Sequence, residues 1–205
     1  MGCTLNLLTQ PMMKRVLLVF AFASLSAQIA CAQLEYQAFL DGPSESPPNA
    51  SPATGFADVT YNPTLHTLHV NVSWSGLTGT TTASHIHAAT ASPGTGTAGI
   101  ATTTPYFSGF PIGVTAGTYD NTLDLTQTSS WNASYISGNG GTTAGAEAAL
   151  ASALADDKAY LNIHTTTFGG GEIRGFLVLV PEPSSLALLG LGAGVAGWYR
   201  RRKAA

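Results

Sequence analysis

Basic residues are scarce in the middle of this 205-residue chain. Between residues 33 and 180 only Lys158 and Arg174 are basic, against ten acidic residues, so this segment has a formal charge of −8. The other six basic residues lie near the two ends of the chain. Because an acidic segment repels phosphate backbones, we expect the protein not to bind nucleic acid.

Cysteine is also absent from residues 33–180, because Cys3 and Cys31 both lie within the first 32 residues. This excludes disulfides and cysteine-based metal sites from the segment. About 148 residues are enough chain for one domain that depends on its hydrophobic core. Gly-x-Ser-x-Gly is missing, and the glycines at 94–99 are too loosely arranged for a phosphate-binding loop. The sequence therefore favours a protein without enzymatic activity.

The first 32 residues have the pattern of a secretory signal peptide. Met12-Met13-Lys14-Arg15 forms a basic start, and an apolar run follows from 16 to 30. Translation would then begin at Met12 or Met13. Ala30-Cys31-Ala32 fits the small-x-small cleavage rule, which predicts that the mature chain begins at Gln33. The competing interpretation is a lipoprotein acylated at Cys31, but the leucine expected three residues upstream is missing.

Residues 181–205 form a second targeting pattern, with a Pro-Glu-Pro triplet, an apolar run at about 185–199 and a basic end. The residues concerned are Pro181, Glu182 and Pro183, then Arg200, Arg201, Arg202 and Lys203. About 16 apolar or small residues span roughly 24 Å as a helix, marginal for a hydrocarbon core of about 30 Å but enough for a transient transmembrane anchor. The basic end would stay in the cytoplasm. This segment resembles the PEP-CTERM sorting signal, which implies recognition by an exosortase-type enzyme in a Gram-negative bacterium.

Residues 33–180 have the pattern of a β-domain. The expected strands lie at 36–40, 83–88 and 121–125, with hairpins formed by 55–61 with 65–74 and by 160–164 with 172–177. Residues 144–155 are rich in strong helix formers and predict one helix, while 129–141 is expected to be loop. The fold class is therefore all-β, an antiparallel β-sandwich or partly closed Greek-key barrel with one short helix. A signal peptide and a transmembrane segment would flank it.

Polar and apolar residues alternate on three of these strands. Ile86, Leu161, Ile163 and Ile173 would face the core, which puts the polar residues between them on the other face. These polar residues are His85, His87, Asn162, His164, Glu172 and Arg174. Pairing within the second hairpin would bring His164 near Glu172 and Asn162 near Arg174. We expect the six to form one polar site, provided that the strand with His85 and His87 lies beside the strand at 160–164. His66 and His69 belong to no motif and are interpreted as ordinary strand residues.

Three of these motifs together resemble the CHRD domain, a module first described in chordin. They are His85-Ile86-His87, Asn162-Ile163-His164-Thr165 and Gly171-Glu172-Ile173-Arg174-Gly175. Ser44-Glu45-Ser46-Pro47-Pro48 and Ser75-Gly76-Leu77 also look like the family. The resemblance covers about residues 34–178 and implies a fold more than an activity.

Two functional hypotheses follow from these patterns. The first is an exported, non-catalytic module with a structural or binding role, sorted to the cell envelope or extracellular matrix, with polysaccharide or another surface protein as candidate partners and no cofactor. The alternative is a metal-binding or redox protein that holds Zn²⁺ or Cu²⁺ through His85, His87 and His164, with Glu172 as a further ligand or neighbour. His-x-His on a strand superficially resembles a ligand pair of copper/zinc superoxide dismutase, although the remaining ligands of that enzyme are missing. A purely structural polar network, with Arg174 paired to Glu172, competes with the metal site.

Overall fold

The structure is a computed structural model, and it describes residues 33–181. The predicted signal peptide, most of the PEP-CTERM-like segment and its transmembrane run lie outside the described residues. Within 33–181, no helix has both the length and the apolar character that crossing a bilayer requires.

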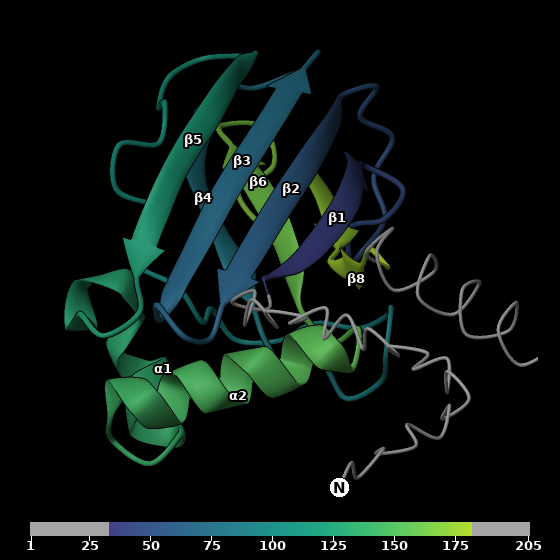
Figure 1. Ribbon diagram of the computed structural model, residues 1–205. Coiled ribbons are helices and arrows are strands. Elements are labelled where there is room, and N and C mark those ends of the chain that lie inside the picture. The colour runs from purple at the N-terminus through teal and green to yellow at the C-terminus, as the bar shows by residue number, and fades with distance from the viewer. Residues whose placement is uncertain (1–32, 182–205) are drawn as a thin grey trace, which may run out of the picture.

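One antiparallel sheet curls into a half-barrel, as the alternating pattern predicts (Figure 1). Its strands in spatial order are β4, β6, β7, β1, β2, β3 and β5, and β8 pairs with β1. The strand bounds are β1 Leu34–Asp41, β2 Thr54–Asn62, β3 Thr67–Ser75, β4 Thr81–His87, β5 Gly117–Asp124, β6 Tyr160–Thr165, β7 Ile173–Phe176 and β8 Val178–Leu179. The all-β fold class is therefore confirmed, and strands distant in sequence become neighbours.

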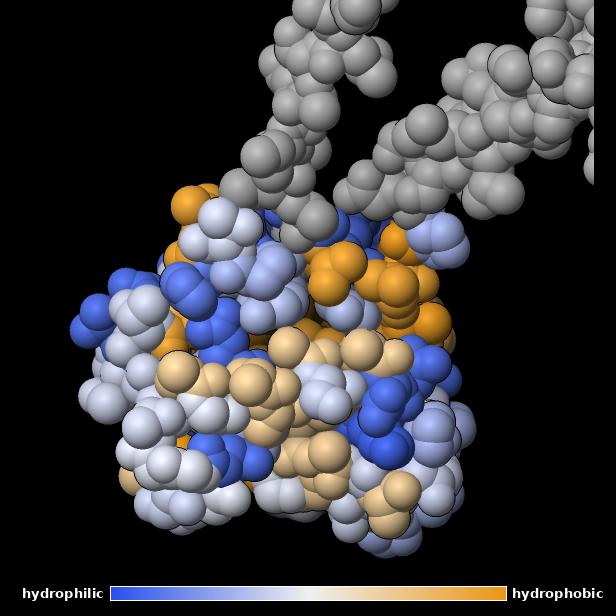
Figure 2. Space-filling view, turned by 60° about the horizontal axis from the view of Figure 1, so that its bottom comes forward, coloured by the Kyte–Doolittle hydropathy of each residue, from blue (hydrophilic) through white to orange (hydrophobic). Residues whose placement is uncertain are grey.

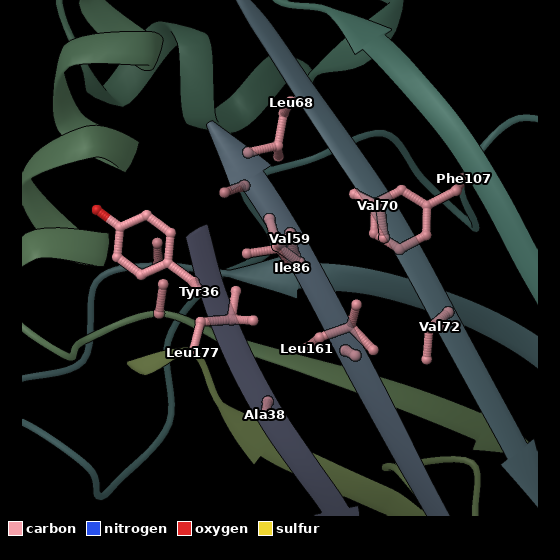
Figure 3. Close-up of a cluster of buried hydrophobic side chains, with 14 of the residues drawn as sticks. Tyr36, Ala38, Val59, Leu68, Val70, Val72, Ile86, Phe107, Leu161 and Leu177 are labelled. Carbon is pink, nitrogen blue, oxygen red and sulfur yellow. The ribbon is translucent and has the colours of Figure 1, made fainter. Parts of the chain in front are cut away.

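The inward-facing side chains of the curled sheet form a single core. Leu68, Val70 and Val72 on β3 meet Ile86 on β4 and Leu161 on β6, and all five side chains are completely buried. Figure 3 shows side chains from these strands pointing into the space that the sheet encloses. Each buried aliphatic side chain contributes roughly 1.5–3 kcal/mol to folding. The same alternation leaves every second side chain of β4 and β6 on the opposite face.

Helix α2 (Thr143–Ala155) lies across one end of the half-barrel (Figure 1). Thr142 caps its first turn by accepting a hydrogen bond from the backbone N–H of Gly145, and Leu150 and Leu154 pack into the core. Figure 2 views the molecule from this end and shows a surface of mixed polarity. The helix predicted at 144–155 is thus present.

Two local predictions are wrong. The stretch 129–141 is not all loop, because it contains part of the short helix η1 (Thr128–Ser130) and α1 (Ala133–Gly138). The side chain of Asn132 caps the start of α1 by accepting a hydrogen bond from the backbone N–H of Ser134.

His66 is not a strand residue. It lies in the turn between β2 and β3 with a positive φ of 53°, because the turn closes through a left-handed residue before β3 begins. Its Nδ1 lies 2.9 Å from Oε2 of Glu147, and Oε1 of the same carboxylate accepts a hydrogen bond from the hydroxyl of Tyr61. These contacts tie the turn to α2. His69 is on β3 as expected, beside Asp120 on the outer face.

Candidate metal centre

Strand pairing brings the three candidate histidines together. β4 and β6 are antiparallel neighbours, with His85 opposite Asn162 and His87 opposite Tyr160. Ile86 and Leu161 occupy the core side of the same two strands, so the histidines must point to the other side. The condition set by the sequence, that the first histidine strand lies beside the second, is met.

The three imidazoles form a compact cluster. One ring nitrogen from each of His85, His87 and His164 lies within 4.8 Å of the other two. The ring centroid of His85 is 4.7 Å from that of His87 and 4.7 Å from that of His164. Tetrahedral coordination with metal–nitrogen bonds of about 2.0–2.1 Å would place the nitrogens about 3.3 Å apart. A shift of the order of 1 Å per ring would therefore convert the cluster into a three-nitrogen metal site.

Backbone carbonyls orient two of the rings. Nδ1 of His87 donates to the carbonyl oxygen of Ala98 at 2.8 Å, and Nδ1 of His164 donates to that of Gly169 at 3.0 Å. In a neutral ring this leaves Nε2 without a proton and free to coordinate, the arrangement usual for metal-ligating histidines. Nε2 of His164 lies 3.1 Å from Oδ1 of Asn162. Because Nε2 of the neutral ring has no proton to donate, the Asn162 amide would have to turn its NH₂ group toward this nitrogen to form a hydrogen bond.

Two nitrogens of the cluster have no hydrogen-bond partner although they are buried. They are Nδ1 of His85 and Nε2 of His87. A buried polar atom without a partner costs roughly 1–3 kcal/mol, so a ligand that fills the space between the rings would recover this energy. These two nitrogens are therefore available to contact a ligand.

The cluster favours uncharged imidazoles. Burial, followed by the neighbouring His87 and His164, lowers the pKa of His85 to about 3. Burial also lowers the pKa of His87 and of His164 below the ordinary value. Neutral imidazole is the form that binds a metal, so protons compete weakly for this site at neutral pH.

Tyr160 and Arg174 form one wall of the cluster. The Tyr160 ring stacks on His87 with centroids 4.7 Å apart and an angle of 6° between the rings. The guanidinium carbon of Arg174 lies 4.7 Å from the centre of the Tyr160 ring, close enough for a cation–π interaction. Arg174 also donates to the carbonyls of Ser44 and Gly96. It thereby joins β7 to two loops and holds the stacked pair in place.

The acidic partner of Arg174 is Glu45, and the predicted Arg174–Glu172 pair is wrong. Nε of Arg174 lies 3.8 Å from Oε2 of Glu45, and both side chains are buried. Burial raises the pKa of Glu45 to about 7, although Arg174 acts in the opposite direction. Glu45 belongs to the Ser-Glu-Ser-Pro-Pro motif that resembles the family, so the sequence marked this residue as a candidate. No local pattern predicted that it would pair with Arg174.

Glu172 does not lie with the three histidines, contrary to the sequence prediction. It precedes β7, where the alternation has not begun, and its side chain turns to the opposite side. Its carboxylate accepts hydrogen bonds from Ser51 and Thr165, each at 2.6 Å, and from the backbone N–H and hydroxyl of Thr78. Burial acts to raise the pKa of Glu172, but these hydrogen bonds outweigh it and hold the pKa below its ordinary value. Glu172 ties three segments together and has no free lone pair for a metal.

Of the six predicted site residues, the structure therefore brings His85, His87, His164 and Asn162 together and places Arg174 beside them through Tyr160. Tyr160 was not among the candidates, although it shares the polar face of β6 with Asn162 and His164. The carbonyls of Ala98 and Gly169 come from loops, where residue type gives no signal for such a role.

Comparison with known families gives two matches that together cover the described domain and the C-terminal segment. The CHRD domain matches residues 36–177, and the PEP-CTERM protein-sorting motif matches residues 179–203. No curated protein and no solved structure matches the chain.

Proposed function

The chain belongs to the CHRD domain family and ends in a PEP-CTERM sorting signal, and from this premise we propose that it is a binding module that holds Zn²⁺ or Cu²⁺ outside the cytoplasm. The sorting signal indicates export to the envelope or surface of a Gram-negative cell, with transient anchoring in the membrane and recognition by an exosortase-type enzyme.

One observation carries the proposal. Three buried or half-buried imidazoles offer nitrogens within 4.8 Å of one another, and two of their nitrogens have no other partner. Imidazole suits Zn²⁺ and Cu²⁺, whereas Mg²⁺ and Ca²⁺ prefer oxygen ligands. The carbonyls that receive Nδ1–H of His87 and His164 support the proposal, because they would fix both rings with Nε2 toward the ion.

The histidines can hold three positions of a tetrahedral ion, and the neutral side chain of Asn162 lies beside them, 3.1 Å from Nε2 of His164. With three neutral imidazoles the ion keeps its full positive charge, so the remaining position would accept water or an anion. Arg174 and Tyr160 would act by holding His87 in place and not as ligands.

Metal analysis of the full chain tests the proposal. The protein is purified in mild detergent, incubated with ZnCl₂ or CuSO₄ and dialysed. Its bound metal is then measured by inductively coupled plasma mass spectrometry. We expect one ion per chain. His87→Ala and His164→Ala should each weaken binding at least tenfold, and the double variant should abolish it. His69→Ala is the matched control, because His69 lies on the outer face beside Asp120 and should bind as the wild type does.

A second readout does not depend on metal content. A ligand that binds only the folded state at 100 times its dissociation constant stabilises that state by about 2.7 kcal/mol, so added metal should raise the melting temperature of the wild type and not of the double variant. Absence of stoichiometric metal, or an equal loss of binding in His69→Ala, would contradict the proposal. The imidazoles would then be a buried structural cluster.

A further inference from the structure

The outer face of β1, β2, β3 and β5 carries a row of side chains that the metal site does not use. Phe39 on β1 is directly opposite Phe56 on β2, Phe56 is opposite Ser73 on β3, and Ser73 is opposite Thr118 on β5. All four side chains face outward. Figure 1 shows this face toward the viewer, and no helix within residues 33–181 lies across it.

The side chains of Phe39 and Phe56 are exposed to solvent, whereas phenylalanine is usually buried. Phe39 is 59% exposed and Phe56 is 41% exposed. Neighbouring strands are about 4.8 Å apart, so the two rings lie side by side and form one apolar wall. Exposed aromatic neighbours of this kind mark an interaction site more often than a single exposed residue does.

A shallow groove of about 380 Å³ runs along this row. Its lining includes both phenyl rings and the hydroxyl side chains of Ser73, Ser75 and Thr118. The next row of the sheet adds Asp58, Asn71 and Asp120, with the Asn71 amide donating to Asp120 at 3.1 Å. An apolar wall therefore meets hydroxyl, amide and carboxylate groups along one edge.

We propose that this groove binds a neutral polysaccharide made of hexopyranose units. One face of a pyranose ring carries C–H groups and is apolar, so it packs against an aromatic ring. The hydroxyl groups around the ring edge both donate and accept hydrogen bonds, and the side chains of Ser73, Thr118 and Asn71 can do the same. A pocket with an apolar wall and a few converging polar groups is the usual form of a small-ligand site.

The charge of the domain decides which polymer fits. Asp58 and Asp120 lie beside the groove, and residues 33–180 contain only two basic side chains, Lys158 and Arg174. Arg174 is buried beside Glu45, and Lys158 is paired with Asp156. An anionic polymer would find no positive charge at the groove and would be repelled by the aspartates. A neutral polymer meets neither penalty.

Affinity electrophoresis of the full chain in mild detergent tests the proposal. Gels contain hydroxyethyl cellulose or galactomannan as neutral probes, alginate as the acidic probe, or no polymer. We expect at least one neutral probe to retard the wild type and alginate not to. Phe39→Ala and Phe56→Ala should each weaken the retardation at least tenfold in apparent affinity, while Phe56→Trp should retain it.

Leu65→Ala is the matched control, because Leu65 is 63% exposed in the turn between β2 and β3, away from the groove, and its loss should leave retardation unchanged. The proposal is overturned if neither neutral probe retards the wild type, if alginate alone does, or if both phenylalanine variants behave as the wild type. Sedimentation measures whether the chain associates with itself. If the phenylalanine variants lose self-association but are still retarded by the neutral polymers, the face is an interface between two copies of the chain and the proposal is overturned. Metal binding should be the same in all these variants, so the two proposals fail independently.

Discussion

Single residues of the histidine cluster make a pH-dependent contribution to stability whose sign follows from their pKa values. Burial lowers the pKa of His85 to about 3 and lowers that of His87 and His164, whereas in the unfolded chain each is near 6.5. Below pH 6.5 the unfolded state therefore binds more protons, and stability falls as pH falls. Glu45 acts oppositely between pH 7 and about 4.5, because burial raises its folded pKa to about 7. The effect of this one carboxyl on stability offsets the effect of only one of the three imidazoles, so stability still falls as pH falls.

We therefore predict that His85→Phe makes the metal-free protein less sensitive to acid. Removing one buried neutral imidazole should reduce the slope of the unfolding free energy against pH by up to about 1.4 kcal/mol per pH unit between pH 6 and 4. Denaturant titrations in a chelator at several pH values measure this slope. Ile86→Val is the control, since it should lower stability at every pH without changing the slope. Parallel curves for wild type and His85→Phe would show that His85 takes up a proton in the folded state.

At the scale of elements, the loop between β6 and β7 contacts both the histidine cluster and Glu45. Its Gly169 carbonyl orients His164, and Gly171 has a φ of 129°, a value that residues with a side chain rarely adopt. A Cβ on Gly171 would also collide with the Glu45 carboxylate. Gly170 has neither constraint, because a Cβ there would meet nothing within 4 Å. The sequence showed three adjacent glycines without distinguishing them.

The prediction is that Gly171→Ala destabilises the protein by about 1–3 kcal/mol, whereas Gly170→Ala changes stability by less than about 0.5 kcal/mol. Chemical denaturation of the two variants beside the wild type gives both numbers. Metal affinity should also fall in Gly171→Ala if the displaced loop carries the Gly169 carbonyl away from His164. Equal stability of the two variants would mean that the loop relaxes around a side chain at 171.

For the whole molecule, the C-terminal signal decides where the domain is held. The matched motif covers residues 179–203, which include the Pro-Glu-Pro triplet and the basic end. The domain described at 33–181 has its own buried core, formed by side chains from the curled sheet and α2. Retention and folding should therefore be separable.

Deleting residues 181–205 should release a folded, soluble domain from the membrane fraction, and replacing Pro181, Glu182 and Pro183 by alanine should block processing while leaving the protein anchored. Fractionation of cells followed by immunoblotting measures both effects, with Ala204→Ser as a control outside the matched motif. Aggregation of the deleted form would indicate that the apolar run contributes to the core of the domain.

The sequence by itself determined the β character of the domain, the inward side chains and the faces of His85, His87 and His164. It could do so because alternation with a period of two is local and is set by which side chains leave water. The family motifs and the C-terminal sorting signal were likewise readable along the chain.

Only the tertiary structure decided that β4 pairs with β6, which brings His85 and His87 into one cluster with His164, almost 80 residues further along the chain. It also decided that Arg174 pairs with Glu45, while Glu172 accepts hydrogen bonds from Ser51 and Thr165. The pairing of β1 with β2 likewise placed Phe39 and Phe56 in one row with hydroxyl side chains. Pairing between distant strands depends on how the whole sheet curls to bury its core, and loop carbonyls act as acceptors whatever the side chain. Neither property is encoded in a short stretch of sequence.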